Sequence, residues 1–290
     1  MLAQRIDNRA ILDRIRIRRM TAKEVAFAID LAAGEGWNPG IHDGACFYAT
    51  DPAGFFVAEL DGELVGSISA VAYNDSFGFI GLYIVKPEFR GIGIGTRLGE
   101  AGMAYLTGHN IGLDGVLAQQ SNYNGHGFRA AYQNLRYEGV GGGIMPEGVV
   151  DISEVPYKEL LEYDAGIFTA HRPQFIKCWL VQPEGAALAV IEDGHLAGYG
   201  VIRKCQIGHK IGPLFADNEH IAEDLFRALK SHVPGEPVFL DTPEVNSKAV
   251  ALAERHKMSV VFQTVRMYTN EEPQHISRNR IFGVTTFELG

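Results

Sequence analysis

The chain has 290 residues, of which 46% are hydrophobic and 21% charged, a composition typical of a globular protein with one or two domains. Its formal net charge of −9 argues against a general nucleic-acid binder, so we expect no nucleic-acid partner. The sequence contains no apolar run approaching the roughly eighteen residues of a membrane-spanning helix, so we expect no membrane partner either.

The cysteines Cys46, Cys178 and Cys205 are widely spaced and form no CxxC pair. This spacing fits a reducing compartment and offers no zinc-binding pattern, so we expect no bound metal. The first residues, MLAQRIDNRAILDRIRIRRM, lack the apolar segment of a secretory signal. The sequence therefore predicts a cytoplasmic protein.

Local patterns predict the first elements. Residues 14–20 (RIRIRRM) alternate charged and apolar side chains, which indicates a strand. Thr21 and Glu24 have the spacing of a capping box, and the helix that they begin should end at Gly34. Two β-rich runs flank Asp61-Gly62, which predicts a hairpin.

The next segments continue the alternation of strands and helices. Residues 78–85 (GFIGLYIV) are almost all apolar, which predicts a central strand. A glycine-rich segment follows, and then a helix from about Thr96 to Thr107. Residues 115–120 (GVLAQQ) are predicted as a buried strand, and residues 127–137 (GFRAAYQNLRY) as a helix.

The second half of the chain repeats this order. Residues 187–204 (ALAVIEDGHLAGYGVIRK) match residues 55–71 (FFVAELDGELVGSISAV), and two later segments match in the same order. Chance recurrence of Asp-Gly hairpins is the alternative, but three matches in order favour a duplication joined within residues 141–156. We therefore expect an α+β fold with mixed sheets, organised as two tandem units at 14–145 and 150–290.

Residues 90–95 (RGIGIG) place glycines between a strand and a helix, an arrangement that holds phosphates through backbone N–H groups and the helix N-terminus. The Walker motif requires a lysine that is missing here, and Thr96 stands where the dinucleotide fingerprint requires its third glycine. A nucleotide-binding protein of the Rossmann type is therefore disfavoured.

The segment LYIVKPEFRGIGIGTRL closely resembles the acyl-CoA pyrophosphate loop of the GNAT N-acetyltransferase superfamily, whose signature is Arg/Gln-x-x-Gly-x-Gly/Ala. Arg90, Gly93 and Gly95 fill its three positions. The second half resembles a YitH-type acetyltransferase domain through the segments IGPLFADN, RMYT and FGVTTFELG. The whole chain thus resembles a tandem GNAT protein.

The resemblance implies an acetyl-CoA co-substrate and the residues that hold it. The backbone of the central strand would bind pantetheine, the glycine loop would bind the pyrophosphate, and an asparagine would hydrogen-bond pantetheine. These positions are Tyr83, Ile84, Val85, Arg90, Gly91, Ile92, Gly93, Ile94, Gly95, Thr96 and Asn124.

The resemblance also implies a tyrosine that protonates the leaving thiolate. Matching the stretch YQNLRY to the family's helix motif assigns this role to Tyr132, with core packing as the alternative. The general base is left open. Many family members carry a glutamate where this chain has Phe79 or Ile80, and the nearest carboxylates, Glu59 and Asp75, have the pattern of solvated charges.

The second half lacks the arginine–glycine pattern, so we expect it to shape the acceptor pocket or an interface rather than to catalyse. The candidate acceptor-binding residues of the two halves are Trp37, His42, Asp43, Arg172 and Trp179. The predicted activity is acetyl transfer to a primary amine of a small molecule. The alternative is a non-catalytic acyl-CoA sensor, and the acceptor and the oligomeric state are left open.

Overall fold

The computed structural model describes residues 8–273 and 276–290. The first half contains α1 (Asn8–Arg14), β1 (Ile15–Arg19), α2 (Val25–Gly34), α3 (Asp43–Thr50), β2 (Phe55–Leu60), β3 (Glu63–Ala72), β4 (Phe77–Val85), α4 (Ile94–Tyr105), β5 (Asn110–Val116), α5 (Gln120–Gly125) and β6 (Arg129–Val140).

The second half repeats the order from β1 to β6 element by element. It contains β7 (Val149–Asp151), α6 (Tyr157–Phe168), α7 (Pro173–Trp179), β8 (Ala186–Glu192), β9 (His195–Lys204), β10 (His209–Ala216), α8 (Glu219–Ser231), β11 (Pro237–Pro243), α9 (Ser247–Arg255) and β12 (Ser259–Tyr268), followed by the extra strand β13 (Ile281–Gly283). This repetition confirms the predicted duplication and the α+β fold of two tandem units.

The elements with strong local signals form where the sequence predicts them. Thr21 and Glu24 form the capping box ahead of α2, which ends at Gly34. The β2–β3 turn places Asp61 at φ 50° and Gly62 at φ 90°, the left-handed conformations of a tight hairpin turn.

The predictions between residues 115 and 137 are wrong. β5 ends at Val116, and residues 117–119 form a 3₁₀ helix that leads into α5. The predicted helix over 127–137 is instead the strand β6, in which alternate side chains (Tyr132, Asn134 and Arg136) are buried. β6 pairs with β11 on one side and β12 on the other, and this pairing overrides the helix propensity of its Ala, Gln, Leu and Arg residues.

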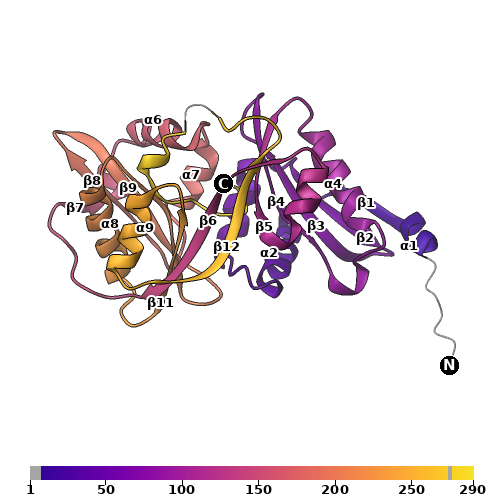
Figure 1. Cartoon of the computed structure of the whole chain (residues 1–290), viewed down its shortest axis with the longest axis horizontal. Helices are drawn as coiled ribbons and strands as arrows, with labels where there is room; N and C mark the ends of the chain where they lie inside the picture. The colour runs from indigo at the N-terminus through magenta and orange to yellow at the C-terminus, as the bar shows by residue number, and fades with distance from the viewer. Residues whose placement is uncertain (1–7, 274–275) are drawn as a thin grey trace.

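The two halves exchange their last strands. The described residues form a 13-stranded sheet in the order β1-β2-β3-β4-β5-β12-β6-β11-β10-β9-β8-β7, with β13 on β10. β12 thus lies beside β5 of the first half, and β6 lies beside β11 of the second, where the two strands cross the centre of Figure 1. The division at 14–145 and 150–290 stays a prediction about sequence units, because in space each half includes a strand of the other.

Matching residues of the two copies hold the exchanged strands. The segments YQNLRY of β6 and FQTVRM of β12 place Arg136 and Arg266 at equivalent positions, and β5 and β11 carry Asp114 and Asp241 at equivalent positions. Arg136 makes two hydrogen bonds to Asp241, at 2.6 and 2.7 Å, and Arg266 makes two to Asp114, at 2.9 and 2.7 Å. Each exchanged arginine therefore pairs with the aspartate of the other half that is equivalent in position to the one in its own half.

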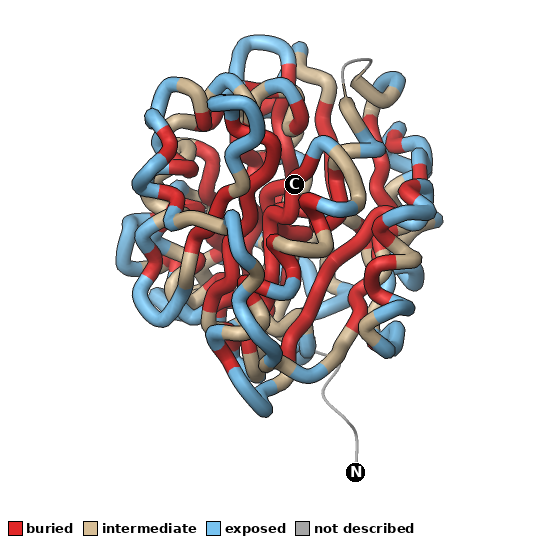
Figure 2. Tube along the Cα trace, turned by 90° about the vertical axis from the view of Figure 1, so that its left-hand side faces the viewer, coloured by how far each residue is buried: buried red, intermediate tan, exposed pale blue. Residues whose placement is uncertain are grey.

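A single large hydrophobic cluster crosses the boundary between the halves. It includes Phe47 of α3, Leu82 of β4 and Trp179 of α7, whose ring stacks on Phe175 at 4.7 Å between centroids. The final residues, 284–290, are buried in the middle of the molecule, where the buried segments surround the C-terminus in Figure 2. The halves therefore share this cluster, in addition to a cluster that lies mainly in each half.

A disulfide between Cys46 of α3 and Cys178 of α7 also joins the halves, with its Cα atoms 5.2 Å apart. The wide spacing of the cysteines was interpreted as typical of a reducing compartment, and it gave no sign of this pair, while Cys205 is free and buried. Separation along the chain hid a pair that the packing of α3 against α7 brings together. None of the described helices is long and apolar enough to cross a membrane.

Candidate functional site

A gap opens where β4 and β5 separate. The two strands run parallel and pair from Phe77–Asn110 to Ile80–Leu113, after which they diverge. Just beyond this point Leu82 adopts φ 46°, and its carbonyl oxygen accepts a hydrogen bond of 2.7 Å from Ser67. The backbone that follows on β4 is therefore free of its β5 neighbour, which is the position predicted to bind pantetheine.

The glycine loop stands at one end of this gap. Gly91 has φ 76° and Gly93, the N-cap residue of α4, has φ 101°, conformations that favour glycine. Within the described chain no side chain caps α4, so its first-turn N–H groups remain available to an anion. A Cβ atom at Gly93 would approach Leu12 at 3.2 Å, so backbone conformation explains this glycine better than space for a ligand does.

A groove of about 450 Å³ connects the loop to the gap. Its lining residues are Glu35, Trp37, Tyr83, Ile84, Val85, Arg90, Gly91, Gly95, Val116, Ala118, Gln119, Asn122 and Tyr123. Six of the residues predicted to bind the co-substrate are thus brought together in one groove.

The other predicted co-substrate residues have different surroundings. Ile94 is fully buried, Ile92 packs partly buried against the core of the first half, and Thr96 lines a neighbouring cavity. Asn124 is exposed outside the groove, and Asn122 of the same short helix lines it instead.

Arg90 organises the loop. Its Nε donates a hydrogen bond of 2.8 Å to the carbonyl oxygen of Val85, and its guanidinium pairs with Glu35. Tyr83 supports the other side of the loop, because its hydroxyl donates a hydrogen bond of 2.6 Å to the carbonyl oxygen of Gly95.

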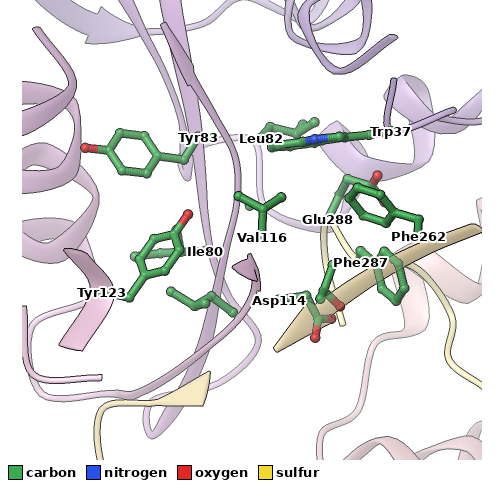
Figure 3. Close-up of a pocket in the computed structure, with 13 residues that line it drawn as sticks. Trp37, Ile80, Leu82, Tyr83, Asp114, Val116, Tyr123, Phe262, Phe287 and Glu288 are labelled. Carbon is green, nitrogen blue, oxygen red and sulfur yellow. The ribbon is translucent and has the colours of Figure 1, made fainter. Parts of the chain in front are cut away.

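A second cavity continues from the gap toward the other half. Its lining residues are Trp37, Ile80, Gly81, Leu82, Tyr83, Leu113, Asp114, Val116, Tyr123, Phe262, Thr264, Phe287 and Glu288. Figure 3 shows Tyr83 and Tyr123 on one side of Val116, with Trp37, Phe262, Phe287 and Glu288 gathered on the other. The walls of this aromatic cavity are therefore mainly apolar, with five aromatic residues among the thirteen, and both halves contribute to them.

Tyr123 of α5 lies where the groove meets this cavity, because it lines both. Burial raises the pKa of its hydroxyl to about 12, so the phenol is protonated at neutral pH. The stretch YNGHGF (residues 123–128), rather than YQNLRY, therefore occupies the junction between the last helix and the last strand. The sequence signal that could have identified Tyr123 is the Gly127-Phe128 pair, because the family's helix motif resembles YEKLGF and its tyrosine stands five residues before the final aromatic residue.

The assignment of Tyr132 to a catalytic helix is wrong. Tyr132 lies on β6 and lines a separate cavity with Phe168, Phe215 and Arg266, and burial raises its pKa. The strand exchange is the physical reason. Phe262 of β12 is the counterpart of Tyr132 in the repeat, and it lies in the first half's cavity in its place.

Of the predicted acceptor residues, Trp37 lines the cavity, and its carbonyl oxygen accepts a hydrogen bond of 2.6 Å from Arg136. The others have structural contacts elsewhere. Asp43 pairs with Arg203 and Arg172 with Asp164 in buried ion pairs, Trp179 donates to the carbonyl oxygen of Gly212 within the core, and His42 pairs with Glu184 at the surface.

The second half fills the equivalent positions with its own chain. β13 pairs with β10 at Leu214–Gly283 and Phe215–Ile281, along the part of β10 that corresponds to the free part of β4. At the start of α8, the Asn218 side chain accepts hydrogen bonds from the backbone N–H groups of His220 and Ile221, at 2.9 and 3.1 Å. These contacts occupy both the strand edge and the helix N-terminus that the first half leaves open.

A sheet with splayed parallel strands, a glycine loop at the start of a helix and a groove between them defines an acyl-CoA-dependent acyltransferase fold. Two family models match the chain, the acetyltransferase (GNAT) family over residues 26–130 and an acetyltransferase (GNAT) domain over residues 160–283. The holothin acyltransferase of Pseudoalteromonas sp. (strain SANK 73390) is 31% identical over 263 residues, which are 89% of each chain.

Two solved structures share the fold. A putative acetyltransferase from Pyrococcus horikoshii aligns with a TM-score of 0.81 at 23% identity and covers 96% of both chains. A tandem GNAT protein from the clavulanic acid biosynthesis pathway aligns with a TM-score of 0.61 at 14% identity, over 89% of this chain and 100% of the other.

The chain therefore belongs to the GNAT acetyltransferase family and carries two GNAT domains in tandem. Enzymes of this family use an acyl-CoA co-substrate. Among the described residues, no cluster of three or more His, Cys, Asp or Glu side chains could hold a metal ion.

Proposed function

We propose that this protein transfers an acetyl group from acetyl-CoA to a primary amine of a small molecule. The observation that carries the proposal is the junction of the two spaces in the first half. The groove leads from the glycine loop along β4 to Tyr123, and the aromatic cavity begins at the same tyrosine. A thioester in the groove and an amine in the cavity would meet there.

Each part of the groove suits one part of acetyl-CoA. The free N–H groups at the start of α4 suit the pyrophosphate, because a helix N-terminus favours anions. The unpaired edge of Tyr83–Val85 suits the amide groups of pantetheine, which would bind as an additional strand. Tyr123 would protonate the departing thiolate, because its raised pKa keeps the phenol protonated.

The nature of the acceptor rests on the cavity and on one relative. The cavity is mainly apolar and has a volume of about 30 Å³, which suits the amine end of an acceptor rather than its whole body. The relative at 31% identity is named for acylating holothin, which makes holothin a candidate acceptor for this chain as well.

The cytoplasmic location is also a proposal. Acetyl-CoA as co-substrate supports it, whereas the Cys46–Cys178 disulfide is of a kind that reducing compartments disfavour. The net charge of −9 supports the absence of a nucleic-acid partner.

The first test is calorimetric titration with acetyl-CoA, followed by thiol release in the presence of a panel of amines that includes holothin. We expect one binding site per chain, because β13 and Asn218 occupy the equivalent positions of the second half. We also expect thiol release that depends on an amine. Two sites per chain would contradict the proposed division of labour, and tight binding with no turnover across the panel would favour the acyl-CoA sensor.

A further inference from the structure

The C-terminal segment passes from the second half into the aromatic cavity of the first. After β13, the backbone N–H of Val284 donates to the carbonyl oxygen of Asp241 at 2.8 Å, and Arg172 donates to the Thr285 hydroxyl at 2.9 Å. Near the end, the Tyr73 hydroxyl donates to the carbonyl oxygen of Leu289 at 2.7 Å. The segment is therefore fixed along its length by contacts with both halves.

β4 is shaped to receive this segment. A Cβ atom at Gly81 would lie 1.9 Å from the carbonyl oxygen of Glu288, so only glycine allows the two backbones to approach this closely. Gly81 stands directly after the last residue of β4 that pairs with β5. The segment therefore reaches the cavity at the point where the strands diverge.

Glu288 places a carboxylate in the cavity, and the hydrogen-bond acceptor sites of that carboxylate are only partly used. Its side chain is 3% exposed and lines the cavity, and Oε2 accepts a hydrogen bond from the Thr286 hydroxyl. Among residues 8–273 and 276–290, Glu288 forms no ion pair. The other cavity carboxylate, Asp114, differs, because Arg266 and Asn134 bind its oxygens.

Buried charged side chains of the neighbouring strands lie within electrostatic range of Glu288. It interacts electrostatically with three buried cations, Arg136 of β6, Arg203 of β9 and Lys210 of β10. Asp241 and Asp43 pair with the two arginines, whereas the Lys210 ammonium donates to the carbonyl oxygen of Asn38 at 2.9 Å.

We propose that Glu288 binds the ammonium group of the acceptor and removes its proton, which makes it the general base that the first half itself lacks. The proposal rests on the proposed acetyl transfer. It also assigns the acceptor class, a primary ammonium next to an apolar group, because the carboxylate lies with Trp37, Phe262 and Phe287 in a cavity of about 30 Å³, which has room for the ammonium but not for the whole molecule.

The proton balance of the reaction is simple. The ammonium gives one proton to Glu288, and the freed lone pair forms the C–N bond to the thioester carbonyl. The C–S bond then breaks with its electron pair on sulfur, and the sulfur takes a proton from Tyr123. The nitrogen gives its second proton to the Tyr123 phenolate, which restores the phenol, and Glu288 releases its proton to solvent. The sum is an ammonium and a thioester converted to an amide, a thiol and one released proton.

Binding without acyl-CoA provides a test that does not depend on turnover. The chain has two tryptophans, of which Trp37 lines the cavity and Trp179 is fully buried. The difference in fluorescence between the wild type and Trp37→Phe is the emission of Trp37, and it reports on the cavity. We expect benzylammonium to perturb this signal at lower concentration than benzyl alcohol. Glu288→Gln should remove the preference, with Glu236→Gln, a surface charge change, as the matched control. Equal responses to the two probes in the wild type would overturn the proposal.

Catalysis supplies the second test, with amines that differ in protonation. Glu288→Gln should lower kcat/KM for benzylamine, which is an ammonium at neutral pH, by about 10²-fold or more. For aniline, which is neutral, the change should stay within about threefold because there is no proton to remove before attack. An equal loss for both amines, with unchanged acetyl-CoA binding, would mean that Glu288 only anchors the segment and would overturn its role as base.

The two tests separate this proposal from the proposed function. Acetyl transfer that continues in Glu288→Gln for every amine would reject Glu288 and leave the acetyltransferase intact. If wild-type protein acetylates neither probe amine, the binding measurement alone decides on Glu288, and the amine panel decides on the activity.

Discussion

Tyr123 and Tyr132 lie close in the sequence, yet they line cavities in different halves of the molecule. Tyr123 lies beside the groove because it belongs to α5, which ends at Gly125, before the chain crosses to the second half. Tyr132 leaves with β6, which crosses to β11. A general acid must lie within hydrogen-bond reach of the atom that it protonates, so position decides between two tyrosines whose pKa values are both raised by burial.

We predict that Tyr123→Phe lowers kcat by about 10²-fold or more while acetyl-CoA affinity changes little, because the substitution keeps the ring and deletes the proton donor. The loss should appear equally in kcat and kcat/KM, as expected for an interaction that forms only in the transition state. Steady-state kinetics and calorimetric titration measure the two quantities.

Tyr132→Phe is the matched control for this prediction, since it removes the same hydroxyl from the other cavity. We expect near wild-type turnover. If Tyr132→Phe lost activity and Tyr123→Phe retained it, Tyr123 would not be the general acid.

At the scale of elements, the exchange of β6 and β12 relies on two equivalent buried ion pairs, Arg136–Asp241 and Arg266–Asp114. In the first of these pairs the side chain of Arg136 is 3% exposed and that of Asp241 is 1% exposed. Water therefore does not solvate either charge when its partner is removed. Removing one member of a buried pair is far more costly than removing a surface charge.

We predict that Asp241→Asn lowers the free energy of unfolding by about 3–5 kcal/mol, because it leaves the Arg136 guanidinium buried without a compensating charge. Denaturant unfolding followed by circular dichroism measures this change. The double variant Arg136→Met/Asp241→Leu should recover most of the loss, since a well-packed apolar pair can replace a buried ion pair.

Glu223→Gln offers a surface comparison, because Glu223 pairs with the half-exposed Arg255 at 3.1 Å as well as with His256. Its cost should stay within about 1 kcal/mol. A similar small cost for Asp241→Asn would show that the pair does not hold the exchanged strands.

The sequence predicted those elements whose causes are local. The alternation in RIRIRRM, the Thr21–Glu24 capping box and the Asp61-Gly62 turn each act within a few residues, and each has its predicted structure. β6 was misassigned because its partners, β11 and β12, follow it by about a hundred residues or more of chain. Local propensity cannot represent such a pairing.

The candidate site divides in the same way. The glycine loop and the central strand are contiguous in the chain, and six of the residues that their motif singled out lie in one groove. Glu288 lies in the same site because of the C-terminal segment, and Phe262 because of the exchanged strand. The sequence around residue 80, where the site is formed, contains no pattern that predicts either contact. Aligning YQNLR with FQTVR would have revealed the repeat of this strand, although not the exchange.

At the scale of the whole molecule, the halves are interlocked rather than placed side by side. They share the hydrophobic cluster that includes Phe47, Leu82 and Trp179, and they exchange strands. The C-terminal segment follows β13, which pairs with β10 of the second half, and its Phe287 and Glu288 line the cavity of the first half. The Cys46–Cys178 disulfide adds a covalent link between residues separated by 132 positions. These contacts should make the chain unfold as one cooperative unit, although tandem domains often unfold separately.

We therefore predict a single unfolding transition by both circular dichroism and tryptophan fluorescence, with Trp37 in the first half and Trp179 in the second as probes. A reductant should lower the midpoint of the wild type, because a disulfide that closes a long loop contributes about 2–4 kcal/mol, mainly by restricting the unfolded chain. The Cys46→Ala/Cys178→Ala variant should have that lower midpoint already and should not respond to the reductant. Cys205→Ala, which removes the free buried thiol, should keep the response. Two resolved transitions would show that the halves unfold independently in spite of their exchanged strands, and a wild type indifferent to reductant would show that the disulfide does not form in solution.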